Sequence, residues 1–268
     1  MPISFNAIDC TPLVIDNEFE ITDEGKLASY VAEIVLGRYA NVKRVLKSLA
    51  TTSFRITEDE VSYAIARLDA KDKSDKDIEK RDGWIFQIIS WLALFIESSD
   101  QDFYNQPPHD APAQHGLDGI AVTIGSDKKI EEIVITEDKF TKNPRNLIQR
   151  QIWPEFSDFE MGIHDNKIVG RISALLEHLD GGTILEINQN DLCSKELRRY
   201  RVGINRLSYH ADKKGKETLF NEYDKKVVGS NPHRRFASTI YKDDIRKWMD
   251  DFILLVIEEL KKKKPIHV

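Results

Sequence analysis

The stretch "HGLDGIAVTIGSDKKIEEIVITEDKF", residues 115–140, decides the fold. It predicts a β-hairpin, because two apolar arms flank the turn "GSDKK" at 125–129. Each arm also carries charge where a buried strand should avoid it: Asp118 in the first, Glu137 and Lys139 in the second. A buried charge is costly unless it has a partner. The positions of these three groups relative to one another are therefore the first question that the sequence raises.

Simple hairpin geometry brings the three charged groups together. If the turn is centred between Asp127 and Lys128, Asp118 lies across from Glu137, with Cβ atoms about 5 Å apart. The period of two along a strand places Glu137 and Lys139 on one face and Asp138 on the other. Two carboxylates this close repel, so one keeps its proton unless a cation lies between them.

A hard divalent ion, Mg²⁺ or Mn²⁺, would resolve that conflict. Asp118 and Glu137 are the candidate ligands, with the main-chain carbonyl of Asp138 as a third. Lys139 would orient a water for attack on a phosphate. The plainer alternative is an exposed ion-pair cluster, worth about 0–1 kcal/mol. Against it, the second arm is apolar before its charges, as in an interior strand, and Gly116 and Gly119 leave room beside Asp118.

At these residues the chain resembles the PD-(D/E)XK nuclease superfamily. Asp118 takes the place of the first acid, "EDK" at 137–139 takes the place of the (D/E)XK tripeptide, and Leu117 replaces the proline. The stretch "GWIFQIISWLALF" resembles the first core helix, which often carries an acid near its start; here Gln87 takes that place as a candidate catalytic residue. The resemblance implies a restriction-endonuclease-like core, and the neutral Gln87 leaves one metal ion or two open.

More narrowly, "HGLDGIAV" followed by "ITEDKF" resembles HamA, the family of effector subunits of the Hachiman antiphage defence system. This resemblance covers roughly residues 81–155. It implies a DNase that is held in complex with a helicase subunit and is released or activated when phage infection damages DNA.

Outside the hairpin, the pattern predicts an α/β (α+β) fold with a mixed sheet flanked by helices. Residues 1–75 are expected to form an N-terminal helical subdomain and residues 76–268 the nuclease-like domain. Gly37 should interrupt the helical run 26–50, and Thr57 with Glu60 forms a capping box. Further helices are expected at 83–97, from Pro144 to about Trp153, and at 240–263; further strands at "GTILEINQ" (182–189) and "YRVGINRLSY" (200–209).

Two basic runs are candidates for DNA binding. Lys142, Arg145 and Arg150 follow the hairpin. Residues 195–216 hold eight basic residues against two acids, with tyrosines interleaved, as a phosphate-tracking groove requires. The candidate DNA contacts in this second run are Arg198, Arg199, Arg201 and Arg206. The alternative is an ordinary solvated strand and loop.

Composition limits the function classes. The net charge of −6 argues against loose coating of nucleic acid but allows a local basic groove. Two cysteines make no disulfide framework or zinc cluster and fit a reducing cytoplasm. The start lacks a secretory signal, and the apolar run 84–96 is too short to cross a bilayer. No phosphate-cradling glycine loop, nucleophile elbow or HExxH motif occurs.

The sequence therefore predicts a Mg²⁺-dependent deoxyribonuclease with a helicase partner. The partner would grip the helices within 26–68 or the C-terminal helix, since neither is needed for the metal site. The alternative, favoured by Gln87, is a catalytically inactive nucleic-acid-binding or scaffolding subunit. A pure protein-interaction module would leave the basic segment 195–216 unexplained.

Overall fold

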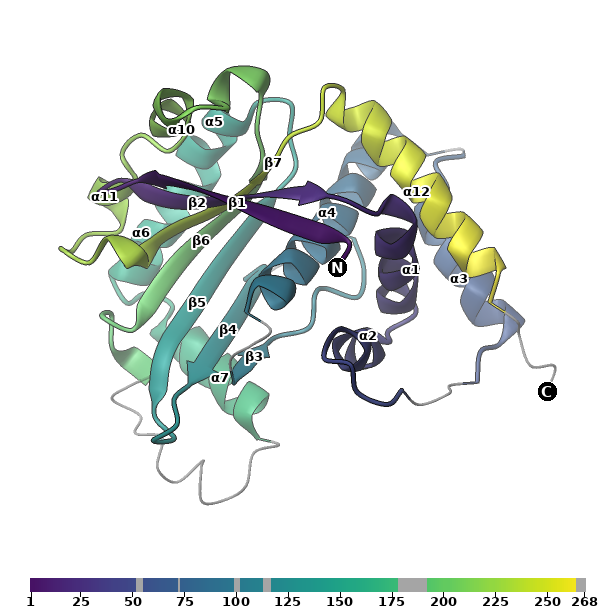
Figure 1. The fold of residues 1–268 in the computed structure, drawn as a ribbon, viewed down its shortest axis with the longest axis horizontal. Coiled ribbons are helices and arrows are strands. Elements are labelled where there is room, and N and C mark those ends of the chain that lie inside the picture. Colours follow the sequence, from purple (N-terminus) through teal and green to yellow (C-terminus); the bar gives the residue numbers. More distant parts are fainter. Residues whose placement is uncertain (52–54, 72, 99–101, 113–116, 178–191, 264–268) are drawn as a thin grey trace.

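The computed structural model describes residues 1–51, 55–71, 73–98, 102–112, 117–177 and 192–263. In this part of the chain, one mixed seven-stranded sheet has the order β1-β2-β7-β6-β5-β4-β3 (Figure 1). Strands β2, β7, β6 and β5 run parallel. β1 is antiparallel to β2 at one edge, and at the other β4 is antiparallel to β5 and the edge strand β3 to β4. The strands are β1 (Ile3–Cys10), β2 (Val14–Ile21), β3 (Phe103–Asn105), β4 (Gly119–Ile124), β5 (Ile130–Lys139), β6 (Arg198–Asn205) and β7 (Arg235–Ile240). The predicted α/β class is confirmed.

The hairpin has the predicted register. Gly119 pairs with Thr136, and the same pairing continues to Thr123 and Glu132, so the next step outward sets Asp118 against Glu137. A bulge next to the turn, between Thr123 and Ile124, shifts the pairing there without moving the charged end. The site residues are therefore positioned by a continuous ladder of main-chain hydrogen bonds.

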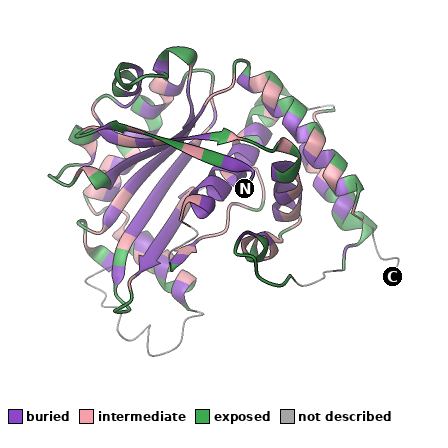
Figure 2. Ribbon diagram, in the orientation of Figure 1, coloured by how far each residue is buried: buried purple, intermediate pink, exposed green. Residues whose placement is uncertain are grey.

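Helices cover both faces of the sheet, and each face has its own apolar cluster (Figure 1). One face packs against α1 (Glu24–Val35), α2 (Tyr39–Leu46), α3 (Glu58–Leu68), α4 (Asp75–Glu97) and α12 (Ile245–Lys261). The other packs against α6 (Trp153–Glu160), α7 (Asp165–Leu176), α10 (Lys213–Leu219) and α11 (Tyr223–Lys226). Because both faces are covered, the inner strands are buried along most of their length (Figure 2).

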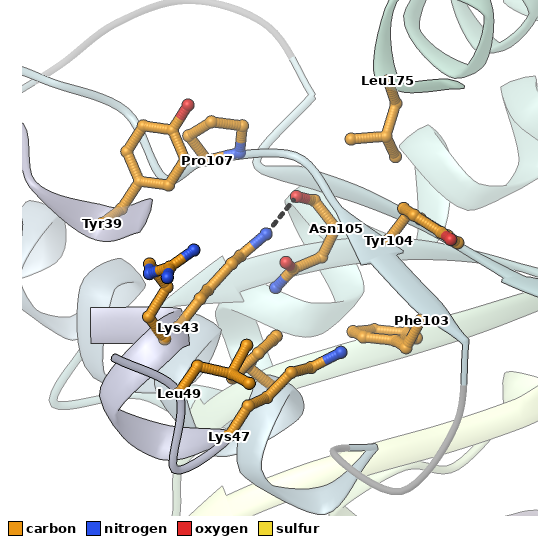
Figure 3. Close-up of a pocket in the computed structure, with 11 residues that line it drawn as sticks. Tyr39, Lys43, Lys47, Leu49, Phe103, Tyr104, Asn105, Pro107 and Leu175 are labelled. Carbon is orange, nitrogen blue, oxygen red and sulfur yellow. Dashed lines mark hydrogen bonds between the residues drawn. The ribbon is translucent and has the colours of Figure 1, made fainter. Parts of the chain in front are cut away.

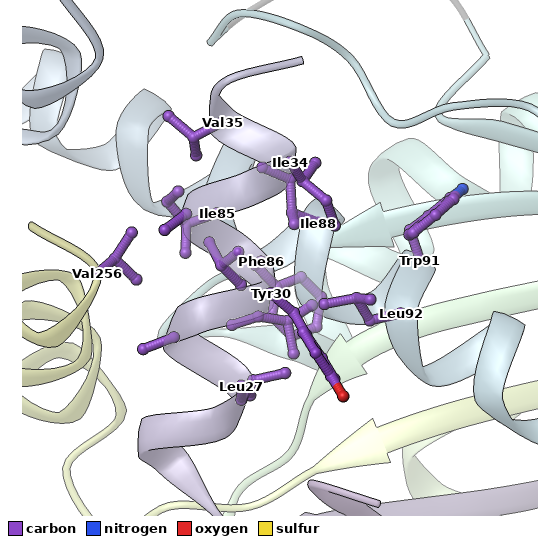
Figure 4. Close-up of a cluster of buried hydrophobic side chains, with 14 of the residues drawn as sticks. Leu27, Tyr30, Ile34, Val35, Ile85, Phe86, Ile88, Trp91, Leu92 and Val256 are labelled. Atoms are coloured by element: carbon purple, nitrogen blue, oxygen red, sulfur yellow. The ribbon is translucent and has the colours of Figure 1, made fainter. Parts of the chain in front are cut away.

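Helix α4 is the central helix of the first layer. The Ser74 hydroxyl caps its first turn by accepting from the Asp77 amide. From Trp84 to Ile96 almost every side chain is buried, on all sides of the helix. Figure 4 shows residues of α1, α4 and α12 in one cluster, with Leu27, Phe86 and Val256 among them. The buried helix predicted at 83–97 forms the greater part of α4, which begins earlier, at Asp75. No helix in the described ranges is long and apolar enough to span a membrane.

Several helix predictions are confirmed by their local signals. The run 26–50 divides into α1 and α2 at Gly37, which has a φ of 78°. Thr57 and Glu60 form the capping box of α3. Pro144 opens α5 (Pro144–Leu147), which continues through the π-helical turn η1 (Ile148–Ile152) into α6. Two short 3₁₀ turns also occur among the helical elements: η2 (Ser208–His210) and η3 (Pro232–Arg234). The strand predicted at 182–189 lies outside the described residues.

The N-terminal residues differ from the prediction. Residues 1–75 were expected to be helical, but β1 and β2 form a hairpin in the central sheet, where β2 runs parallel to β7. The helices α1 and α3 share one apolar cluster with α4 and α12. The N-terminal part is thus packed into the same layers as the rest and is not purely helical.

Gly203 allows strand β6 to lie close to α4. A Cβ atom at this position would overlap the Asp138 carboxylate and the Ser90 hydroxyl. We expect Gly203→Ala to lower the free energy of unfolding by about 1–3 kcal/mol, the cost of overpacking a buried position. Gly170, on an exposed turn of α7 with nothing within 4 Å of the built Cβ, is the matched control.

Gly170→Ala should leave stability unchanged or raise it by about 0.5–1 kcal/mol. Urea unfolding of both variants measures the difference. Equal stability of the two variants would contradict the close packing at Gly203.

Candidate functional site

The charged groups of the hairpin meet where β4 begins and β5 ends. Along β5, Ile133 and Ile135 face the cluster of α6, and the alternation carries Glu137 and Lys139 to the same face. Asp138 points to the α4 side, where its Oδ1 accepts from the Ser90 hydroxyl at 2.5 Å. The predicted division of these side chains between two faces is confirmed.

A single ammonium group joins the two carboxylates. Lys139 Nζ lies 2.6 Å from Asp118 Oδ2 and 2.8 Å from Glu137 Oε2. Asp118 is held in place by two further donors: the Asp138 main-chain amide to Oδ2 at 3.0 Å, and Gln87 Nε2 to Oδ1 at 2.7 Å. The side chains of Glu137 and Asp118 are only 1% and 6% exposed, whereas that of Lys139 is 24% exposed. The cluster is thus an inner carboxylate pair covered by a lysine that reaches solvent.

The cluster's electrostatics follow from burial. Loss of solvation, with the nearby charge of Asp118, raises the pKa of Glu137 well above its usual value. Burial opposes the charge of Lys139, but the carboxylates of Glu137 and Asp118 outweigh it and raise the pKa of the lysine. Burial also raises the pKa of Asp138 to about 6, against the opposing charge of Arg201. The lysine is therefore charged at neutral pH, and the carboxylates require that charge.

The donor set fits a hard divalent ion. Glu137 Oε1 is buried and has no hydrogen-bond partner among the described residues, so one carboxylate oxygen remains available. One oxygen of each carboxylate, Asp118 Oδ2 and Glu137 Oε2, contacts the same cation, as ligands of an ion would. Among the described residues, no three His, Cys, Asp or Glu side chains are grouped so that they could hold a metal ion. At the end of β5 the third carboxylate, that of Asp138, faces α4 instead. The role expected for the main-chain carbonyl of Asp138 stays a prediction.

Gln87 lies at the position where the resemblance to the PD-(D/E)XK nucleases places an acid. Its side-chain amide contacts Asp118, and this contact indicates its role. As a hydrogen-bond donor to Asp118, the amide orients that carboxylate. A neutral amide adds no negative charge for a second ion. The structure thus assigns Gln87 a positioning contact.

An open cavity of about 380 Å³ leads to the cluster. It lies between the first half of α4 and the α5–η1 segment, and Lys139 and Gln87 form part of its wall. Its other lining residues are Lys80, Gly83, Trp84, Asp138, Phe140, Leu147 and Gln151. Gln151 belongs to the π-helical turn, a feature frequent at functional sites. Sequence reasoning missed Lys80 and Gln151, because their proximity to the hairpin depends on the packing of α4 and η1.

The basic groove predicted over 195–216 does not form on three of its four candidate arginines. Arg198 and Arg201 are fully buried, and Arg206 is 8% exposed. Each is ion-paired: Arg198 with Asp165 at 2.7 Å, Arg201 with Asp138 at 3.1 Å, and Arg206 with Glu18 at 2.5 Å. These guanidinium groups are enclosed and already paired with carboxylates, so they are not available to phosphates.

Arg199 is the half-buried exception. It lies over the Phe236 ring and contacts Glu132 at 3.2 Å. Its charge, too, is shared with a carboxylate within the sheet.

The basic residues after the hairpin lie nearer the surface. Lys142 and Arg150 are exposed, and Arg145 is half-buried, donating to the carbonyls of Leu219 and Asn221. Lys142 and Arg150 keep the exposure that a DNA contact requires. For Arg145, the carbonyl contacts add a structural role.

Neither a family model, nor a curated protein, nor a solved structure matches this chain. A function for this site is therefore argued from the arrangement of its side chains.

The buried carboxylate pair predicts a pH-dependent stability. A carboxyl group whose pKa is raised in the folded state binds more protons folded than unfolded, so its contribution to stability falls as pH rises from the unfolded pKa toward the folded one. Removing the ammonium should enlarge this effect. In EDTA, we expect Lys139→Met to lower the free energy of unfolding by about 3 kcal/mol at pH 7.5, and by much less at pH 5.

Thermal unfolding of the wild type and Lys139→Met at both pH values measures the difference. The double variant Lys139→Met/Glu137→Gln is the control, because one carboxylate charge is gone and most of the pH dependence should go with it. A stability loss that is equal at pH 5 and pH 7.5 would show that the ammonium does not offset the carboxylates.

Proposed function

We propose that the protein is a metal-dependent deoxyribonuclease. The observation that carries this proposal is the convergence of Asp118 and Glu137 on one cation, beneath a lysine that faces an open cavity. The arrangement supports a core like that of the PD-(D/E)XK nucleases, with a mixed sheet whose β4–β5 hairpin supplies all three groups. Mg²⁺ or Mn²⁺ would be held by Asp118, Glu137 and the carbonyl of Asp138, and would supply a Lewis acid for the phosphate.

The chain's own groups have separate tasks in this proposal. Asp118 and Glu137 are the acids that hold the cation, and Gln87 fixes the orientation of Asp118. With an ion neutralising the carboxylates, Lys139 would be free to turn toward the cavity and orient the attacking water. The hydrogen bonds of Lys139 in the structure show that its Nζ already lies within reach of both acids.

DNA would approach through the cavity between α4 and η1. Lys80 and Gln151 line it and offer a cation and an amide at its rim. Lys142 and Arg150 are exposed on the segment that follows β5 and are retained as candidate DNA contacts. The net charge of −6 would weaken the binding of DNA elsewhere on the surface.

We further propose that the nuclease acts as the effector of an antiphage defence complex with a helicase. The likeness of "HGLDGIAV" and "ITEDKF" to HamA motivates this part of the proposal. A nuclease without sequence selectivity would damage its own cell, so a partner that restrains it is expected. Part of α12 is exposed, including Leu254, and offers one surface for such a partner.

A non-catalytic DNA-binding or scaffolding subunit is the second candidate. It is favoured by the amide of Gln87 at the acid's place and by the fact that Lys139 supplies a positive charge to both carboxylates without an ion. In that case the cluster would be a structural ion-pair network at the end of the sheet.

Cleavage of plasmid and linear DNA with Mg²⁺, Mn²⁺ or EDTA separates the two candidates. We expect cleavage with either ion and none with EDTA. Glu137→Gln and Asp118→Asn should each reduce the rate by at least about 100-fold, because charge stabilisation at the phosphate is lost while side-chain shape is kept.

Lys129→Ala is the matched control, since Lys129 is an exposed lysine in the turn of the same hairpin. Its cleavage rate should equal that of the wild type. If purified wild-type protein binds DNA but cuts neither form with either ion, the non-catalytic subunit is the better account.

A further inference from the structure

A second cavity, of about 360 Å³, opens between α2 and β3 (Figure 3). Its size is within the range of small-molecule sites. Aromatic side chains from three elements line it: Tyr39 of α2, Phe95 of α4, and Phe103 and Tyr104 of β3. Pro107, Leu49 and Leu175 complete its apolar walls. None of the residues of the carboxylate cluster takes part, so this is a separate site.

The charge of this cavity is opposite to that of the whole chain. Lys43, Arg44 and Lys47 line it, and no described lining residue carries a carboxylate. Lys43 is half-buried, Arg44 and Lys47 are exposed, and within the described residues none of the three is in an ion pair. Three cations without a counter-charge make a local positive potential in a protein of net charge −6.

Lys43 is held at the cavity by neutral groups. Its Nζ donates to the Asn105 carbonyl at 3.1 Å and lies 5.3–5.9 Å from the ring centroids of Trp91, Phe95 and Tyr39. Figure 3 shows the Lys43 side chain extended toward Asn105, with the hydrogen bond between them. Burial, together with the charge of Lys47, lowers the pKa of Lys43 to about 8. Placing the Lys43 ammonium among neutral groups is unfavourable for its charged form, and a bound anion would stabilise that form.

Asn105 is the second feature that points to a ligand. Its side chain is 2% exposed, yet neither the amide oxygen nor the amide nitrogen has a hydrogen-bond partner within the described residues. Buried amides are normally paired, and an unpaired donor and acceptor in one side chain is costly. An amide that offers both a donor and an acceptor matches the edge of a nucleobase.

We propose that the cavity between α2 and β3 binds a nucleotide, with its phosphate on Lys43, Lys47 and Arg44 and its base among the aromatic side chains beside Asn105. The cations account for the phosphate, because ammonium and guanidinium groups pair with phosphate oxygens. The rings account for the base, which stacks on aromatic faces. Phosphate and base could belong to a free mononucleotide or to the end of a single strand, and the experiment separates these sources.

Isothermal titration of the Glu137→Gln protein tests the proposal, since any added strand then stays intact and cleavage is not measured. The probes are AMP, TMP, adenosine, inorganic phosphate and 5′-phosphorylated (dT)₆. We expect at least one nucleotide or the oligonucleotide to bind about tenfold more tightly than adenosine or phosphate, because only these combine charge and ring. Binding of a mononucleotide identifies a free nucleotide, and binding of (dT)₆ alone identifies a strand end; both support the site.

Variants locate the binding. Lys43→Met and Asn105→Ala should each weaken the affinity by about tenfold, the loss of one charged or buried hydrogen bond. Lys47→Met repeats the test at an exposed position that leaves the packing intact. Lys247→Met, an exposed lysine on α12 outside the cavity, should have no effect.

Three results would overturn the proposal. These are no binding of any nucleotide or of (dT)₆, binding of phosphate as tight as that of the nucleotides, and binding that Lys43→Met, Lys47→Met and Asn105→Ala all leave unchanged. Circular dichroism of each variant confirms that a lost affinity does not reflect a lost fold.

Discussion

The ammonium group of Lys139, between the carboxylates of Asp118 and Glu137, is the interaction on which the centre of this molecule depends. β5 is covered by helices on both faces, so charges at its end cannot be solvated in the usual way. Burial and the charge of Asp118 raise the pKa of Glu137 well above its usual value, and the ammonium of Lys139 opposes them. The lysine allows both acids to lie at the end of a buried strand, and it does so from a position that still reaches solvent. A cation is therefore built into the site, and the proposed metal would take over a role that the fold already fills.

The hairpin could be predicted from sequence because every step of the inference is local. The period of two fixed which face Glu137, Asp138 and Lys139 occupy, and the turn at 125–129 fixed the pairing that sets Asp118 against Glu137. The bulge between Thr123 and Ile124 does not change the pairing at the charged end, because it lies between that end and the turn, beyond the Thr123–Glu132 pair. The same locality explains why caps and breaks at Gly37 and Thr57 were found. Such signals depend on residues three or four positions apart.

The errors arose where a partner lies far away in the sequence. The run 195–216 was interpreted as a surface groove, yet Arg206 pairs with Glu18 and the fully buried Lys216 pairs with Asp16 and Glu18, almost 200 residues earlier. Those acids belong to β2, a strand that the prediction also missed. The two errors have one cause: alternating acids in "VIDNEFEI" have the pattern of an exposed segment until their basic partners are known. A run of like charge predicts an exposed surface only if no distant segment supplies counter-charges to it.

Helix α4 connects the carboxylate cluster to the cavity of the proposed nucleotide. Gln87 holds Asp118, Trp91 follows one turn later beside Lys43, and Phe95 follows after another turn, stacked on Trp91 with ring centroids 5.8 Å apart. These three residues are spaced by four and lie along one face of a helix that is buried on all sides. The residue that orients Asp118 and a residue that lines the cavity, Phe95, are therefore carried by the same helix.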